Sequence, residues 1–308
     1  MTERPRLPDG IHLLERGWLS SNNILICGSA QCALIDSGYA THAGQTLALV
    51  QAALDGRTLD VLVNTHLHSD HCGGNAALQA CYPELHTWIP PGQAPYVTAW
   101  DPYALSYTPT GQICAPFTFS AALQPHTGIA LGDQMWEIHA APGHDPSSVI
   151  LFEPRSRLLL SADALWENGF GVVFPELDGD DAFAEVGRTL DLIESLDPKT
   201  VIPGHGPAFT DVPDALARAR KRLSSFMKNP AKHTRYAAKV LIKFKLLEVQ
   251  TLSFDALLAW ATATDLVAHL HQGDSSHVRF EAWIDKLVTE LVRSGAALRA
   301  NQTVQNAN

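Results

Sequence analysis

The sequence predicts an α/β fold over about the first 210 residues, followed by an α-rich C-terminal portion. Two observations carry this prediction. Up to residue 202, short apolar runs bounded by turn residues alternate with stretches of helical spacing, and after Pro207 helical spacing dominates. Strands that alternate with helices are typical of layered α/β proteins. We therefore divide the chain into a layered domain over 1–210 and an α-rich domain over 211–308.

The first half of the α/β part consists of three short apolar runs, a helix and a buried strand. The runs cover 11–14, 23–27 and 33–35, and turn residues separate them. Apolar residues at helical spacing predict a helix over 40–55. The apolar run 59–64 then predicts a short buried strand.

The second half repeats this pattern of strands followed by a helix. Strands are predicted at 135–140, 149–152 and 157–161, a helix at 181–195 and a last strand at 200–202. In the C-terminal portion, helices are predicted at 213–227, 232–249, 254–262 and 280–294, with a short strand or tail at 296–304.

The segment 90–122 differs from both halves because it is rich in proline and aromatic residues. Two readings stay open, a loop that packs on its own body and a lid over a substrate. In the second reading Trp100 and Tyr103 would contact the substrate.

The composition excludes several classes of protein. Hydrophobic residues make up 46% and charged residues 18%, which suits a buried core and not a disordered chain. The formal charge of −10 argues against a dedicated binder of nucleic acid or anionic membrane. No apolar run is long enough for a membrane span, and residues 1–10 lack the apolar core of a secretory signal, so we expect neither feature. We expect the five cysteines to be reduced thiols and the protein to be cytoplasmic.

A cluster of polar side chains follows the strand at 59–64. His66, His68, Asp70 and His71 fall within six residues, and two glycines follow them at a predicted tight turn. Packing gives no reason to concentrate four costly polar groups at the end of a strand. The pattern therefore predicts a metal site.

This H-x-H-x-D-H array resembles the metallo-β-lactamase superfamily, whose pattern also requires a histidine, an acidic residue and a second histidine, each after a strand. His144, Asp163 and His205 stand at these positions. The resemblance covers residues 10–210 and implies a four-layer αββα sandwich. One departure is Ala162, since the family usually has glycine before the acidic residue.

The resemblance also implies the role of each ligand. One metal ion would bind His66, His68 and His144, a second would bind Asp70, His71 and His205, and Asp163 would bridge the two. Asp70 would also be catalytic. The cofactors would be two divalent ions, with zinc favoured and iron or manganese as alternatives. Such a pair lowers the pKa of a shared water toward about 7 and so supplies a nucleophile.

Comparison of these residues with those of the branches of the superfamily favours some reactions over others. Asp163 disfavours antibiotic hydrolysis, because true β-lactamases carry cysteine there or lack a bridging carboxylate, and His68 disfavours the flavodiiron branch, which has glutamate. The ligand set resembles glyoxalase II. The Gly-His-Gly-Pro turn at His205 and a winged-helix-like tail resemble the subgroup that includes β-lactamase-like endoribonucleases. We predict a hydrolase of a thioester, ester or lactone, with an endoribonuclease acting on single-stranded RNA and a non-catalytic binding protein as alternatives.

Trp166 and Phe170, just after Asp163, are expected to help shape the pocket for a small-molecule substrate. Ten basic residues and no acidic residue lie between 218 and 245: Arg218, Arg220, Lys221, Arg222, Lys228, Lys232, Arg235, Lys239, Lys243 and Lys245. They form either a solvated helix face, an anion-binding rim for a charged substrate, or, less favoured, a groove for single-stranded nucleic acid. No membrane partner is expected, and the sequence leaves open whether the chain forms a homodimer.

Overall fold

The computed structural model describes residues 5–275 and 277–307. These residues form two compact units. The first unit comprises the described residues up to Leu105 together with Ile113–Leu223, and the second comprises Ser106–Gln112 and the described residues from Ser224 on. Among the described residues, no helix is both long enough and apolar enough to cross a membrane.

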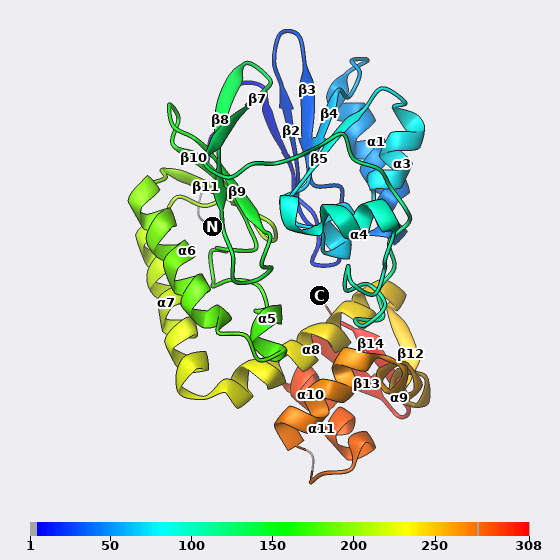
Figure 1. Ribbon diagram of the computed structural model, residues 1–308. Coiled ribbons are helices and arrows are strands. Elements are labelled where there is room, and N and C mark those ends of the chain that lie inside the picture. The colour runs from blue at the N-terminus through cyan, green and yellow to red at the C-terminus, as the bar shows by residue number, and fades with distance from the viewer. Residues whose placement is uncertain (1–4, 276, 308) are drawn as a thin grey trace. The chain divides into compact units, whose positions relative to one another are not determined.

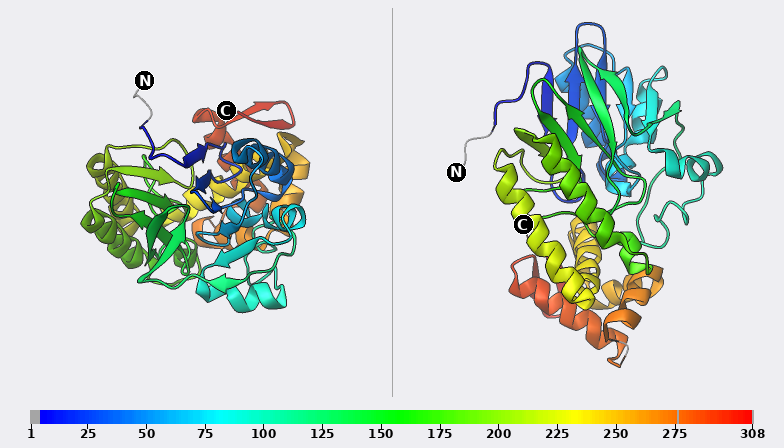
Figure 2. Two further views of the ribbon diagram at one scale, coloured as in Figure 1. Left: turned by 90° about the horizontal axis from the view of Figure 1, so that it is seen from above. Right: turned by 60° about the vertical axis from the view of Figure 1, so that its left-hand side comes forward.

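The division between the units falls inside helix α7 (Val212–Lys228), whereas the sequence placed a boundary after residue 210. The first part of α7 belongs with the first unit because it pairs with helix α6 (Ala182–Leu196). Arg220 forms ion pairs with Asp191 and Glu194 of α6, both at 2.7 Å. Figures 1 and 2 show the two helices side by side.

The first sheet of the first unit has the order β1-β2-β3-β4-β5-β6. Its strands β1 to β3 are antiparallel, and β3 to β6 are parallel. The strands are β1 (Ile11–Leu14), β2 (Asn23–Cys27), β3 (Cys32–Ile35), β4 (Val61–Val63), β5 (His86–Ile89) and β6 (Ala121–Ala122).

The second sheet has the order β11-β10-β9-β8-β7, in which only β10 and β11 pair in parallel. Its strands are β7 (Thr127–Leu131), β8 (Gln134–Ala140), β9 (Val149–Glu153), β10 (Leu158–Ala162) and β11 (Thr200–Pro203). The helices of the first unit besides α6 and α7 are η1 (Ala40–His42), α1 (Ala43–Leu54), α2 (Ser69–Cys72), α3 (Asn75–Cys81), η2 (Pro91–Gln93), α4 (Ala94–Ala99) and α5 (Phe174–Leu177).

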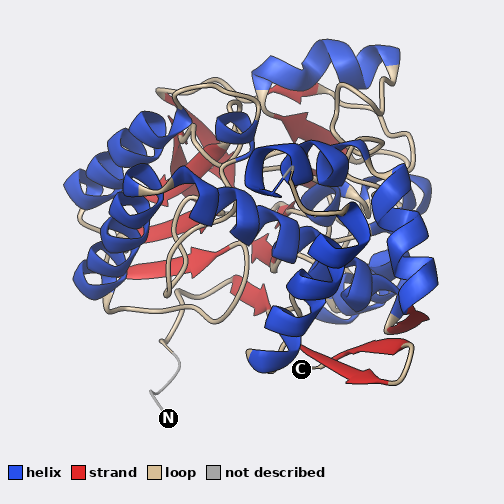
Figure 3. Ribbon diagram, turned by 90° about the horizontal axis from the view of Figure 1, so that it is seen from below, coloured by secondary structure: helices blue, strands red, loops and turns tan. Residues whose placement is uncertain are grey.

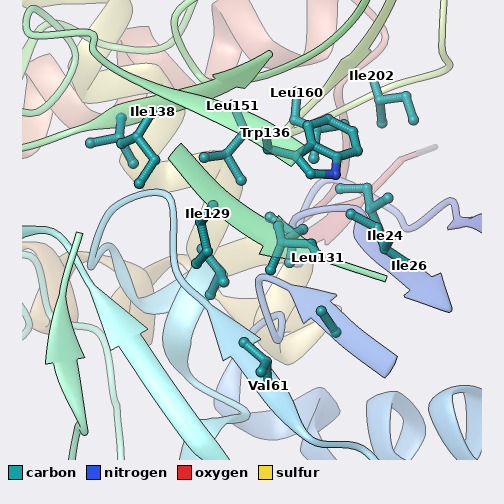
Figure 4. Close-up of a cluster of buried hydrophobic side chains, with 14 of the residues drawn as sticks. Ile24, Ile26, Val61, Ile129, Leu131, Trp136, Ile138, Leu151, Leu160 and Ile202 are labelled. Atoms are coloured by element: carbon teal, nitrogen blue, oxygen red, sulfur yellow. The ribbon is translucent and has the colours of Figure 1, made fainter. Parts of the chain in front are cut away.

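Side-chain alternation along the strands separates two hydrophobic layers. Ile24 and Ile26 of β2 face the second sheet and pack in a core with Trp136 and Leu160 (Figure 4). Leu25, between them, packs on the opposite face in the cluster that includes residues of α1 and α3. With α6 and α7 outside the second sheet, the layers are helix, sheet, sheet, helix (Figure 1). The predicted αββα sandwich is confirmed.

The second unit is α-rich, as predicted, with a small sheet of order β12-β14-β13. Its elements are α8 (Pro230–Val249), β12 (Thr251–Ser253), α9 (Phe254–Ala263), α10 (Asp265–Ser275), α11 (Phe280–Arg293), β13 (Ala297–Ala300) and β14 (Thr303–Asn306). The order of helix, strand, helices and hairpin is winged-helix-like. The segment that we expected to be one short strand or tail is this β13–β14 hairpin, which Figure 3 shows beside the C-terminus.

The prediction that all five cysteines are reduced is wrong for one pair. Cys27 and Cys32 are directly opposite each other where β2 and β3 meet, with Cα atoms 4.2 Å apart, and they form a disulfide. The hairpin brings together two residues whose pairing the sequence spacing alone did not indicate. Cys72, Cys81 and Cys114 are not in disulfides, and Cys72 is buried as expected.

The second unit contains a buried histidine that should make its stability depend on pH. His233 is 1% exposed, and burial lowers its pKa to about 4 from an ordinary value of 6.5. Between pH 6.5 and 4 the unfolded chain therefore binds this proton more readily than the folded chain. The free energy of unfolding should be highest above pH 6.5 and fall by about 3 kcal/mol as the pH drops toward 4.

Urea unfolding of the wild type and of His233→Gln at several pH values between 4 and 7 measures this contribution. The variant should show a shallower pH dependence of stability in that window. His277→Gln, which changes an exposed histidine of the same unit, should keep the wild-type dependence. Equal slopes for all three proteins would contradict the assignment to His233.

Candidate metal centre

The seven predicted ligands come from loops at the ends of strands in the two sheets. His66, His68, Asp70 and His71 follow β4, and His144 lies between β8 and β9. Asp163 follows β10, and His205 follows β11. The structure brings all seven together in three overlapping groups, and within each group the ligand atoms lie within 4.8 Å of one another.

The first group is made of three histidine nitrogens that face one another. The Nε2 atom of His144 lies 3.3 Å from Nε2 of His66 and 2.8 Å from Nδ1 of His68. The other nitrogen of His144, Nδ1, donates to the backbone oxygen of Val172 at 2.5 Å. Because a carbonyl oxygen only accepts, Nδ1 carries a proton, and Nε2 is the nitrogen that faces the other two histidines.

The second group consists of Asp70, His71 and His205. The Nε2 atom of His205 lies 3.2 Å from Oδ2 of Asp70. The third group consists of His66, His71 and Asp163, so Asp163 lies between the first group and the second. Its Oδ1 is 3.5 Å from Nε2 of His71, and its Oδ2 is 3.4 Å from Nε2 of His144. One carboxylate therefore faces ligands of both groups, as a bridging residue requires.

Asp36 supports this site and was not found from the sequence. Its Oδ2 accepts from Nδ1 of His71 at 2.7 Å and from the hydroxyl of Thr65 at 2.8 Å, and its Oδ1 accepts from the backbone N–H of Thr65. A carboxylate on the far nitrogen of a histidine fixes the tautomer and the ring orientation. The available signal was an acidic residue directly after the apolar run that forms β3.

The donor atoms fit transition-metal ions. The Nε2 atom of His71 is buried and has no hydrogen-bond partner, while Nδ1 holds the proton that Asp36 accepts. Burial lowers the pKa of His66 well below its ordinary value and the pKa of His68 to about 3, so both rings are neutral donors of a lone pair. Imidazole with carboxylate is a ligand set that suits zinc, iron and manganese.

His71 shows how a cation competes with a proton here. Burial lowers the pKa of His71, but the carboxylates of Asp36 and Asp163 outweigh burial, and the net pKa is raised well above its ordinary value. The site therefore attracts positive charge. Because metal ligands must give up their protons, a dication would take the place of that proton.

Two glycines let the backbone approach the ligands. A Cβ atom on Gly204 would lie 2.2 Å from Oδ1 of Asp163, and one on Gly171 would lie 2.4 Å from Nδ1 of His144. The glycine before His205 is therefore needed for close approach to the bridging carboxylate.

Ala162 lies where the family usually has glycine, and its backbone explains that preference. Its φ of 46° is in the left-handed region, at an irregularity in the pairing of β10 with β11. This conformation costs an L-residue roughly 1–2 kcal/mol. Glycine avoids this cost but loses more conformational entropy on folding, which offsets about half of the gain. Ala162→Gly should therefore raise the free energy of unfolding by about 0.5–1 kcal/mol in urea titrations.

Ala130→Gly is the matched control for this prediction, because Ala130 lies in the regular strand β7. It should lower the free energy of unfolding by about 0.5–1 kcal/mol. An equal loss of stability in both variants would show that Ala162 is not strained.

Aromatic rings flank both ligand groups. Phe174 meets the rings of His68 and His144 edge-on, at 4.9 and 5.7 Å between centroids. Trp166 donates from Nε1 to Oδ1 of Asp163 at 3.1 Å and meets His205 edge-on at 5.6 Å. Of the four predicted pocket residues, Trp166 is thus beside the ligands.

The other three predicted pocket residues, also in the first unit, differ in their surroundings. Phe170 is 1% exposed, and the guanidinium of Arg222 lies 5.9 Å from its ring centroid. Trp100, at the end of α4, meets Phe117 edge-on at 5.6 Å. Tyr103 is 60% exposed. Contact of these three residues with a substrate stays a prediction.

The basic residues at 218–245 make contacts inside each unit. In the first unit Arg218 donates to the backbone oxygen of Glu167 and Arg222 to that of Phe170, so they hold the loop that carries Trp166. In the second unit Arg235 pairs with Asp274 and Glu290. In the same unit Lys239 pairs with Glu290, Lys245 pairs with Glu248, and Lys243 donates to the backbone oxygens of Ala296 and Ala307. These contacts are those of a structural helix face, and binding of an anion by this segment stays a prediction.

Comparison with known proteins agrees with this fold. The family model of the metallo-beta-lactamase superfamily matches residues 16–205, which is more than half of the chain. The chain therefore belongs to the metallo-β-lactamase superfamily. The metallo-beta-lactamase family protein TTHA1429 from Thermus thermophilus has a similar structure, with a TM-score of 0.60 at 16% identity over 98% of this chain and 100% of that one. The structure of TTHA1623 in a di-iron-bound form gives a TM-score of 0.55 at 25% identity over 68% of this chain and 98% of that one.

Two curated relatives match about two thirds of the chain. Type A flavoprotein fprA of Rhodobacter capsulatus is 26% identical over 228 residues, which are 67% of this chain and 49% of the flavoprotein. The acyl-coenzyme A thioesterase MBLAC2 of Bos taurus is 25% identical over 229 residues, which are 66% of this chain and 80% of the thioesterase. The match thus spans about half the length of the flavoprotein and most of the thioesterase.

Proposed function

We propose that this protein is a binuclear metal-dependent hydrolase that cleaves a thioester, an ester or a lactone. The observation that carries the proposal is the position of Asp163, whose two carboxylate oxygens face His71 on one side and His144 on the other. Seven nitrogen and oxygen ligands exceed the three or four that one catalytic zinc takes from protein. Zinc is the metal we favour, and the di-iron form of TTHA1623 keeps iron as an alternative.

Two divalent ions would supply Lewis acidity and a water of lowered pKa. The residues of the chain would position the ligands and accept a proton. Asp36 fixes the ring of His71, and Trp166 holds one oxygen of Asp163. Asp70 is the more open of the two carboxylates among the ligands, with 16% of its side chain exposed, and it lies against His205. We assign to Asp70 the proton that the attacking water gives up.

The choice of an acyl substrate is supported by the thioesterase among the relatives and by the aromatic rings beside the ligands. An endoribonuclease would need cations that are available to phosphates. In this chain Arg235, Lys239 and Lys245 are in ion pairs with acidic side chains, which leaves fewer cations of the segment 218–245, such as the exposed Lys221 and Lys228, for phosphates. The thioester, ester and lactone class is therefore the better fit.

A side-by-side screen tests the proposal. Metal-loaded protein is assayed on thioesters, esters, lactones, a chromogenic β-lactam and single-stranded RNA, with Asp70→Ala as the blank. We expect hydrolysis of at least one acyl substrate that the blank does not catalyse. Cleavage of RNA alone would replace the proposal by the endoribonuclease, and turnover of none of these substrates would favour a non-catalytic role.

A further inference from the structure

The loop between β1 and β2 carries an exposed tryptophan next to the ligands. Trp18 is 54% exposed, although tryptophan is among the residues that bury most surface in proteins. A single exposed apolar side chain is common and by itself needs no explanation. The surroundings of Trp18 are what distinguish it.

The ring of Trp18 packs directly on the candidate metal centre. It stacks on the imidazole of His205, with 5.4 Å between centroids and 7° between planes. It also meets Trp166 edge-on at 5.2 Å, and Trp166 in turn donates to Asp163. The exposed surface of Trp18 therefore continues the wall of the site on the side of His205.

The loop that carries Trp18 is fixed to two of the ligand-bearing loops. The backbone N–H of Ser21 donates to the oxygen of Asp70 at 2.9 Å, and that of Asn22 donates to the oxygen of Gly204 at 2.7 Å. The side chain of Asn22 donates to the backbone oxygens of Pro203 and Gly206. Trp18 is thus held in place before any ligand binds, and a pre-organised aromatic surface loses little entropy on binding.

We propose that Trp18 is the platform for the acyl chain of the substrate, and that the site prefers medium-length or longer acyl groups over acetyl. The inference rests on the proposed function. Trp18 contacts the aromatic rings of Trp166 and His205, so a group bound beside His205 would lie close to Trp18. The acyl chain is the apolar part of an ester or thioester, so it is the part that gains from covering this surface.

Acyl thioesters of N-acetylcysteamine test the proposal, because the neutral leaving group stays constant while the chain grows from acetyl to hexanoyl to decanoyl. In the wild type, kcat/KM should rise about tenfold or more along the series. Trp18→Ala should lose about tenfold more activity on decanoyl than on acetyl, and the difference should arise mainly through KM. Trp18→Phe should keep most of the preference, and Met135→Ala, which removes an exposed apolar side chain of β8, should keep all of it.

Equal losses of Trp18→Ala on acetyl and decanoyl would show a structural role and overturn the proposal. A binding measurement separates this failure from failure of the proposed function. Saturation-transfer NMR with acetate and decanoate should show decanoate bound to the wild type and at least about tenfold more weakly to Trp18→Ala. This result without turnover of any thioester, ester or lactone would overturn the proposed function alone. Equal binding of decanoate to both proteins would overturn the proposal that Trp18 is the platform for the acyl chain.

Discussion

Replacement of Asp163 by alanine is expected to lower kcat/KM about a thousandfold or more while the protein stays folded. Asp163 faces His71 and His144 from opposite oxygens, so its loss removes the residue that joins the two ligand groups. The side chains around it are themselves tied to other partners, such as His71 to Asp36 and His144 to Val172. Steady-state kinetics on the substrate found in the screen, with circular dichroism as the check on folding, measures the effect.

Asp191→Ala is the matched control, because it also removes a carboxylate but on α6, where Asp191 pairs with Arg220. It should keep kcat/KM within about twofold of the wild type, since exposed ion pairs contribute little. Turnover of Asp163→Ala above a tenth of the wild-type value would mean that Asp163 does not bridge the site.

Gly204→Ala is expected to lower activity about a hundredfold and to weaken metal binding. The added Cβ would lie 2.2 Å from Oδ1 of Asp163 and 3.0 Å from Cε1 of His71. The backbone of Gly204 cannot easily move away, because its N–H donates to Ala162 and its oxygen accepts from Asn22, both at 2.7 Å. The carboxylate must therefore shift away from the position in which it faces both groups.

Gly44→Ala tests whether the effect comes from the collision. Gly44 is in α1, and a Cβ there would meet nothing within 4 Å. This variant should keep full activity and gain about 0.5–1 kcal/mol of stability, because alanine is the better helix former. If Gly204→Ala kept the metal content and the kcat/KM of the wild type, the close packing around Asp163 would have no functional consequence.

Much of the fold could be predicted from local patterns. Strand β2 could be predicted from the apolar run 23–27, whereas the structure shows that Ile24 and Ile26 face one layer and Leu25 the other. Helix α10 was not predicted, because its residues 265–275 carry only a weak apolar periodicity among histidines and acidic residues. The disulfide was also missed, since it depends on how β2 pairs with β3 and not on the spacing of Cys27 and Cys32 alone.

Four candidate ligands, from His66 to His71, could be found because packing does not explain their concentration after one strand. His144, Asp163 and His205 were found through the resemblance to the superfamily. Asp36 and Trp18 could not be found in this way. Each is remote in sequence from the ligand that it contacts, His71 for Asp36 and His205 for Trp18. The tertiary fold supplies those contacts, through the pairing of β3 with β4 and through the hydrogen bonds of the loop after β1.

The central claim is that two metal ions bind per chain, and metal content tests it most directly. The purified protein is stripped with a chelator, reloaded separately with zinc, iron(II) or manganese, freed of excess metal and analysed by inductively coupled plasma mass spectrometry. We predict close to two ions per chain for at least one of these metals and a lower content for Asp163→Ala. One ion or none per wild-type chain with every metal would contradict the two-metal account.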